Sequence, residues 1–242
     1  MKKSKIIIIS VFTVVFVLVL IFLVFFPALP LYFQMKRECP TINRTVEEFD
    51  FTGDISEDFK EITSCGIILK VPSDMYRKNP DSSVEIYVCG KEKNYNTVVM
   101  FYESSDVSEY NASELSYDEL KSFCSYINED VPQSLYEFQK LNLSLNTDDF
   151  NMRDKELAET FLRLAVSKEF LVGQDKCSHV YSFENNCAEG FIYEYETPKN
   201  YTEYMIEIYR EGKYSTEYSV LIRAENPETA KQIIESIEIT EE

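Results

Sequence analysis

Residues 84–102 read VEIYVCGKEKNYNTVVMFY, and this stretch determines the fold class that we expect. From Val84 to Val88, β-branched residues alternate with other side chains, which is the period of a strand with one buried face. The apolar run 98–102 predicts a second, more central strand. The preceding run 66–71, GIILKV, stops at a proline and predicts a third. A sheet therefore begins near residue 65.

The period then changes to that of helices. Ser116-Tyr117-Asp118-Glu119 is a capping box, and the apolar residues that follow it recur at i, i+3, i+4 and i+7 up to Ile127. A second helix is expected over 152–172, with Asn151 as its N-cap. Residues 135–145 combine both periods, and we interpret them as a helical turn followed by a strand.

Strands resume in the last third of the chain, at 180–183, 191–196, 204–209 and 218–223, with a turn at 210–213 that makes the last two a hairpin. Pro227 then opens a final helix, which is followed by a short strand at 237–239. Seven or so strands with grouped helices predict an α+β domain with a mainly antiparallel sheet flanked by helices.

This order of elements resembles the Mog1/PsbP-like fold over roughly residues 65–240. The matching pieces are the opening strand GIILKVPS, the alternating strands up to Tyr102, the capped helix at Ser116, the late hairpin and the ending AKQIIESI at 230–237. The resemblance implies a sandwich that serves as a binding or assembly module without chemistry of its own. It transfers no functional residue.

The other decisive stretch is residues 6–26, IIIISVFTVVFVLVLIFLVFF, which carries no charge. As a helix it would be about 31 Å long, close to the thickness of a bilayer core. It is longer than the apolar region of a signal peptide and no A-x-A pattern follows, so we expect an uncleaved, single-pass transmembrane signal-anchor rather than a cleaved signal. Lysines 2, 3 and 5 place the N-terminus in the cytoplasm and the rest of the chain outside it.

The expected organisation is therefore a cytoplasmic tail at 1–5, a transmembrane helix at 6–26, a juxtamembrane stalk at 27–64 and an extracytoplasmic α+β domain at 65–242. The chain is acidic, with a formal net charge of −18. Because phosphate backbones need clusters of lysine and arginine, this charge argues against nucleic-acid binding. The simplest role of the charge is to keep the domain soluble.

Six cysteines in an exported chain permit disulfides. Cys177 and Cys187 bracket a stretch with an Asn-Asn turn signal and are the best candidates for a bridge, whereas buried free thiols are the alternative. His179 is the sole histidine. With these two cysteines it gives three ligands in a spacing that does not fit a zinc site, so we expect no metal, no cofactor and no histidine-based catalysis.

Aromatic residues supply the remaining candidate. Alternation places Phe191, Tyr193 and Tyr195 on one face of a strand. If this face is exposed, it would bind protein or glycan; a stripe of this kind is more commonly core.

The sequence thus predicts a membrane-anchored, extracytoplasmic binding or assembly module of the cell envelope, with an envelope or surface protein as its partner. Two alternatives stay open: an extracytoplasmic hydrolase that uses a pair of carboxylates, and a purely structural anchored domain. The sequence identifies neither the ligand nor the oligomeric state, and it leaves bacterial and eukaryotic hosts open.

Overall fold

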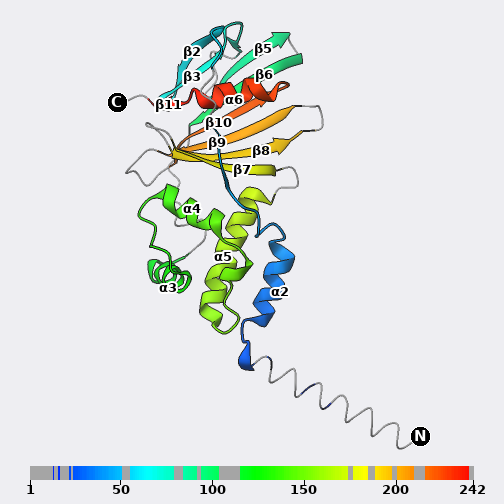
Figure 1. Ribbon diagram of the computed structural model, residues 1–242, viewed down its shortest axis with the longest axis vertical. Helices are drawn as coiled ribbons and strands as arrows, with labels where there is room; N and C mark the ends of the chain where they lie inside the picture. The colour runs from blue at the N-terminus through cyan, green and yellow to red at the C-terminus, as the bar shows by residue number, and fades with distance from the viewer. Residues whose placement is uncertain are drawn as a thin grey trace, which may run out of the picture. The chain divides into compact units, whose positions relative to one another are not determined.

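The structure is a computed structural model that describes residues 13, 16, 22, 24–50, 55–78, 84–91, 94–103, 115–173, 177–184, 189–197, 201–209 and 216–239 (Figure 1). The chain divides into two compact units. A helical unit comprises residues 1–43, 110–131 and 145–171, and a sheet unit comprises 44–109, 132–144 and 172–242. This division differs from the single domain that we expected from residue 65 onward.

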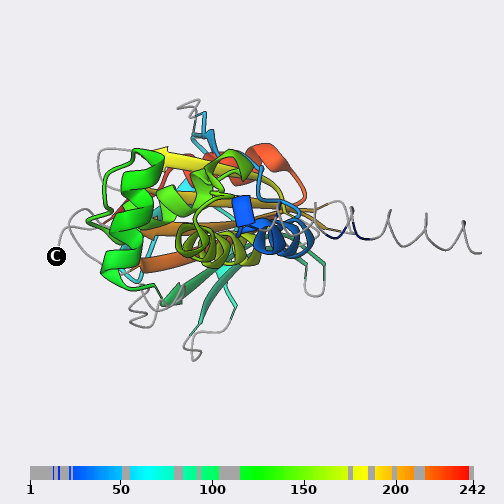
Figure 2. The same cartoon turned by 90° about the horizontal axis from the view of Figure 1, so that it is seen from below.

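The helical unit is built from α2 (Leu29–Glu38), α3 (Tyr117–Ile127), the short 3-10 helix η2 (Thr147–Asp149) and α5 (Lys155–Val172). Figures 1 and 2 both show α2 beside α5. The core between the helices is aromatic. Phe161 of α5 contacts Phe123 of α3 and Phe150, whose ring in turn packs edge-on against Tyr32 of α2 at 5.4 Å.

The capping box of α3 is confirmed. The Ser116 hydroxyl accepts from the Glu119 amide, and the Glu119 carboxylate accepts from the Ser116 amide at 2.8 Å. The N-cap of α5 differs from the prediction. Asp154, not Asn151, accepts from the first free amides of the helix, while Asn151 accepts from the amides of the preceding turn.

The sheet unit holds an eight-stranded sheet in the order β1-β7-β8-β9-β10-β6-β5-β4, antiparallel except at the β1–β7 pair. Its strands are β1 (Glu47–Glu48), β4 (Tyr76–Arg77), β5 (Glu85–Lys91), β6 (Asn94–Glu103), β7 (Cys177–Glu184), β8 (Glu189–Glu196), β9 (Thr202–Tyr209) and β10 (Thr216–Ala224). The predicted α+β class with a mainly antiparallel sheet is confirmed.

A second sheet in the order β11-β3-β2 comprises β2 (Phe59–Ser64), β3 (Ile67–Pro72) and β11 (Glu238–Ile239). Cys65 and Gly66 join β2 to β3 with φ values of 50° and 77°, as a two-residue type I′ hairpin turn requires. Helix α6 (Pro227–Glu235) begins with proline in its first turn after the N-cap Asn226, as predicted.

The main core of the sheet unit joins α6 and the small sheet to one face of the large sheet. Its members include Leu69 and Val71 from β3, Ile233 and Ile234 from α6, and Ile206, Val220 and Ile222 from β9 and β10. Helix α4 (Leu135–Ser144) contacts β8 and β9 through the side chains of Tyr136 and Gln139.

Two further expectations are wrong. Residues 27–64 are not an irregular stalk, because α2 lies in the helical unit and β2 pairs along its length with β3. Residues 141–145 are not a strand, because α4 continues to Ser144. The leucines there alternate with polar residues, which suggested a strand. In the structure α4 is buried on several sides, so its buried residues do not follow the single stripe by which a helix is recognised in a sequence.

The apolar run 6–26 lies largely outside the described residues. Within the part of the chain that the structure describes, no helix is both long and apolar enough to cross a membrane. The transmembrane helix, its orientation and the cytoplasmic tail at 1–5 stay predictions.

Candidate functional site

The predicted aromatic face on β8 is largely core. Phe191 and Tyr193 are 1% and 2% exposed, because α4 covers this side of the strand and Tyr136 stacks on Phe191 at 5.2 Å. Tyr195 is half-buried, and burial raises its pKa to about 12. The proposal of an exposed aromatic binding face is therefore wrong for Phe191 and Tyr193, and these rings follow the core alternative.

A hydrogen-bonded network lies under α4 at this place. The Gln139 amide donates to the Tyr193 hydroxyl at 3.2 Å, and that hydroxyl donates to Glu207 at 3.0 Å. Tyr209 donates to the same carboxylate oxygen at 3.1 Å. Burial, reinforced by the Glu207 charge, raises the pKa of Tyr193 well above its usual range, so the hydroxyl stays protonated as the donor. The network joins α4 to the sheet, and its position in the core suits a structural role.

The second polar cluster contains the only histidine. Tyr181 donates to a Glu194 carboxylate oxygen at 3.1 Å, and His179 Nδ1 lies 3.7 Å from the same oxygen. The His179 and Tyr181 rings stack at 5.9 Å, and the histidine side chain is 52% exposed. The Tyr181 hydroxyl is thus the hydrogen-bond donor to this carboxylate, while the imidazole lies too far away for a direct hydrogen bond. No group of three or more histidine, cysteine or acidic side chains within the described ranges is arranged to hold a metal ion.

The two clusters cannot form the carboxylate pair that the hydrolase alternative requires. Glu194 pairs with Tyr204 across β8 and β9, whereas Glu207 pairs with Phe191. On β8, Glu194 is three residues after Phe191, the residue that lies opposite Glu207. Side chains at an odd spacing on a strand point to opposite faces, so the two carboxylates lie on opposite faces of the sheet. A glycosidase needs its two carboxyl groups about 5 to 9.5 Å apart on either side of one bond.

The predicted Cys177–Cys187 bridge stays a prediction. Cys177 is a buried free thiol and Cys187 lies outside the described residues. Burial raises the pKa of the Cys177 thiol, which makes it a poor nucleophile. Cys65, in the turn between β2 and β3, is the exposed thiol among the described cysteines.

Exposed apolar side chains concentrate in the helical unit. Among the described residues, all the large apolar side chains that are strongly exposed belong to this unit except Tyr76. Phe170 and Val166 lie one turn apart on α5 and are 77% and 46% exposed. On the same helix Ala165 and Lys168 are buried, so these two residues occupy the side turned away from the core. We call Val166 and Phe170 the α5 patch. The sequence of helix 152–172 did not reveal it, because the helix has apolar residues on its buried side too and the sequence does not show which of them are exposed.

The comparisons with known proteins do not identify a family. No family model matches the chain. No curated protein is similar to it either. A crystal structure of a protein from Bacteroides thetaiotaomicron VPI-5482 aligns with 76% of this chain and 50% of its own at 10% identity and a TM-score of 0.33. The chain thus spans about half the length of that protein, and the likeness is too weak to carry an argument. The Mog1/PsbP-like resemblance stays a prediction.

Proposed function

We propose that the protein is a membrane-anchored, extracytoplasmic binding module whose helical unit presents the α5 patch to an envelope or surface protein. The observation that carries the proposal is the exposure of Phe170 and Val166 on neighbouring turns of α5. Exposed aromatic side chains on a regular helix are typical of protein interfaces, where they become anchors once they are desolvated.

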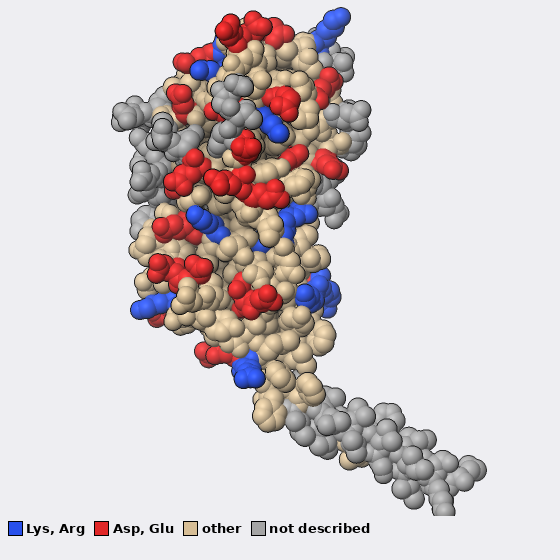
Figure 3. Space-filling view, viewed as in Figure 1, with Lys and Arg blue, Asp and Glu red and all other residues tan. Residues whose placement is uncertain are grey.

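The charges around the patch fit a protein partner. Glu159 and Arg163 lie on the same side of α5 as the patch, one or two turns before it. An apolar centre with a polar border is the usual anatomy of a transient interface. The sheet unit offers a different surface, because Figure 3 shows acidic side chains gathered over it on the face in view. This surface fits the solubility role inferred from the net charge.

Site-specific photo-crosslinking tests the patch. A photoreactive amino acid replaces Phe170 in the full chain, and in a matched control it replaces Glu156, an exposed residue in the first turn of the same helix. We expect one discrete protein adduct from position 170 in intact membranes, none from position 156, and loss of the adduct when Val166→Asp is added. Equal labelling from both positions, or an adduct that Val166→Asp leaves unchanged, would overturn the proposal.

The location is tested separately through Cys65. A membrane-impermeant maleimide should label this exposed thiol in intact cells if the sheet unit is extracytoplasmic. Cys65→Asn is the matched control, since asparagine tolerates the left-handed backbone of that turn. If Cys65 is labelled in lysed cells but not in intact cells, the proposed orientation is refuted.

A further inference from the structure

We propose that the membrane-side end of the helical unit lies in the lipid headgroup layer, with Phe33 of α2 inserted among the lipids and Lys36 and Arg37 against their phosphates. This inference rests on the membrane anchor of the proposed function and adds a lipid surface as a second partner. The occupant follows from the chain itself, because the apolar run 6–26 ends immediately before this part of the unit.

Backbone hydrogen bonds fix the position of the chain as it leaves the apolar run. The Leu29 amide donates to the Phe26 carbonyl at 3.0 Å, and the Ala28 amide donates to the Met152 carbonyl at 3.2 Å. Ala28 is fully buried. The end of the run, the start of α2 and the segment before α5 are therefore held together at one end of the helical unit.

Side chains at this end combine rings with a cation. Phe22, Phe25 and Phe26 line a hollow together with Arg153, and Phe22 and Phe25 are 56% and 66% exposed. A guanidinium beside apolar rings at the end of a hydrophobic segment can keep its charge among headgroups while its stem contacts lipid. Phe22 also packs on Phe26 at 5.7 Å, yet in water it would remain more than half exposed, as would Phe25.

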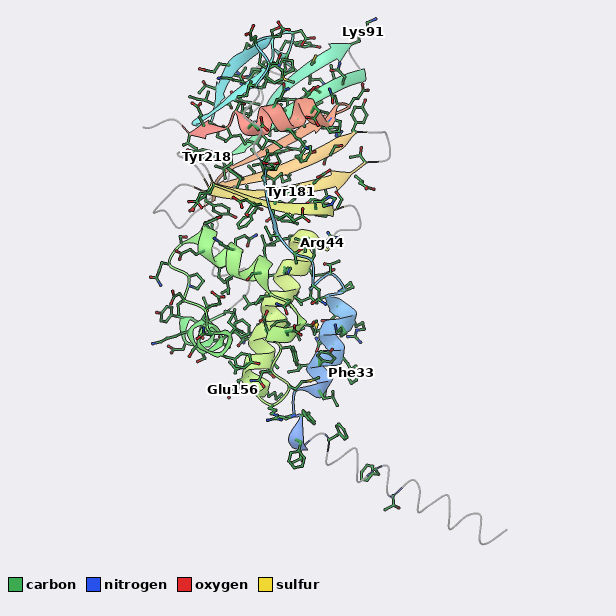
Figure 4. The ribbon with its side chains drawn as sticks, in the orientation of Figure 1. Phe33, Arg44, Lys91, Glu156, Tyr181 and Tyr218 are labelled. Carbon is green, nitrogen blue, oxygen red and sulfur yellow. The ribbon has the colours of Figure 1, made fainter. Side chains whose placement is uncertain are left out.

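The exposed face of α2 repeats this combination. Phe33 is 64% exposed and projects from α2 in Figure 4. Lys36 and Arg37 lie one turn later on either side of it, and both are exposed. The Lys36 ammonium sits 5.6 Å from the Tyr32 ring. An aromatic ring flanked by cations matches the composition of the membrane–water interface.

The charge distribution favours contact with anionic lipid at this end of the helical unit. Anionic lipids attract Lys36, Arg37 and Arg153, although Arg37 also pairs with Glu38 at 2.8 Å and Asp154 follows Arg153. The remainder of the chain, whose net charge is −18, is repelled by such lipids. Contact with the bilayer is therefore confined to this end of the helical unit.

The chain contains no tryptophan, so a single introduced tryptophan reports its own surroundings. Three full-length variants, Phe33→Trp, Phe16→Trp and Phe170→Trp, are reconstituted into vesicles of phosphatidylcholine and phosphatidylglycerol with brominated acyl chains. Phe16 lies within the apolar run, so Phe16→Trp reports whether the run is in the bilayer. At about 1.5 Å per residue, Phe170 lies about 22 Å along α5 from Lys155, the first residue of that helix. Phe170→Trp is therefore the matched exposed control.

We expect brominated lipid to reduce the emission of Phe33→Trp at least twofold relative to unbrominated vesicles, and to leave Phe170→Trp unchanged. Lys36→Glu with Arg37→Glu should remove at least half of that quenching. Quenching of Phe16→Trp without quenching of Phe33→Trp would overturn the inference while leaving the anchor intact. A blue-shifted but unquenched Phe33→Trp would also overturn it, because a protein would then cover the ring. If Phe16→Trp is unquenched too, the anchor itself fails.

Discussion

Replacing Lys168 by methionine should destabilise the helical unit. Lys168 is 1% exposed on α5, and its ammonium donates to the carbonyl oxygens of Ile42 at 2.8 Å and Leu145 at 2.7 Å. Methionine has a similar volume and donates no hydrogen bond. Both carbonyls would remain buried without this donor, and a buried group left unpaired costs about 1–3 kcal/mol. Since burial of the ammonium is itself unfavourable, we expect a net loss of about 2–4 kcal/mol.

Two further variants separate the causes. Lys168→Ala removes the donor and also leaves a cavity, so its loss should exceed that of Lys168→Met by about 1–2 kcal/mol. Lys155→Met removes a lysine that is 64% exposed and paired with Glu159 at 3.3 Å, so its effect should stay within about 0.5 kcal/mol.

The assay is urea unfolding of the full chain in detergent micelles, followed by circular dichroism at 222 nm for the helices and by tyrosine fluorescence. Because the chain has two units, the transitions should be fitted separately if the two signals do not coincide. Stability of Lys168→Met equal to the wild type, with a loss only in Lys168→Ala, would refute the reasoning, since the lysine would then merely fill space.

Three other variants test the remaining contacts. Gly190→Ala should cost more than about 2 kcal/mol in the same unfolding assay, because its Cβ would lie 2.1 Å from the Glu207 carbonyl oxygen and 2.6 Å from the Phe183 ring; an unchanged midpoint would contradict this. Tyr193→Phe should cost about 1–2 kcal/mol, since it breaks the link from Gln139 to Glu207, and Tyr195→Phe, on the same face of β8, is its control. Hydrogen bonds from the Ser116 amide and hydroxyl, with Arg163 next, lower the pKa of Glu119 to about 2. The folded pKa is thus below the ordinary 4.5, so the carboxylate favours folding above pH 4.5 and this contribution is lost as the pH falls toward 2. Carboxyl NMR should show that Arg163→Met raises this pKa yet leaves it below 4.5; a full return to 4.5 would show that the serine bonds are unimportant.

The sequence correctly predicted the helices and strands that are determined by interactions between residues close together in the chain. The capping box at Ser116 and the Asn226-Pro227 start satisfy the free amides of a helix within four residues, so the sequence alone contains the interaction. The alternating strands were found for the same reason. Segment 135–145 was misread because α4 has seven buried residues on several sides, including the polar side chains Gln139 and Asn142. Such a helix has no stripe to detect.

The buried polar contacts join residues that are distant in the sequence, which is why they could not be predicted. Gln139 and Tyr193 are 54 residues apart, and Lys168 and Ile42 are 126 apart. The alternation at Phe191, Tyr193 and Tyr195 favoured core over an exposed face, but it could not show that the Tyr193 hydroxyl bonds Gln139 and Glu207. The α5 patch was missed because an exposed phenylalanine and a buried one are identical in sequence until the helix finds its core.

The position of α5 connects the two proposed surfaces. The segment just before α5 is joined to the residue that follows Pro27 by the hydrogen bond from the Ala28 amide to the Met152 carbonyl, and the last turns of α5 carry Val166 and Phe170. Near the patch, the carboxylate of Glu169 accepts from both the amide and the hydroxyl of Thr41, at 3.0 and 2.7 Å. The segment that follows α2 is thereby attached to the same turns. Different hydrogen bonds therefore attach the segment before α5 and the last turns of α5 to the rest of the helical unit. A substitution that removes bonds at the last turns should affect the other end less. Lys168→Met should therefore weaken crosslinking from position 170 while lipid quenching at position 33 persists.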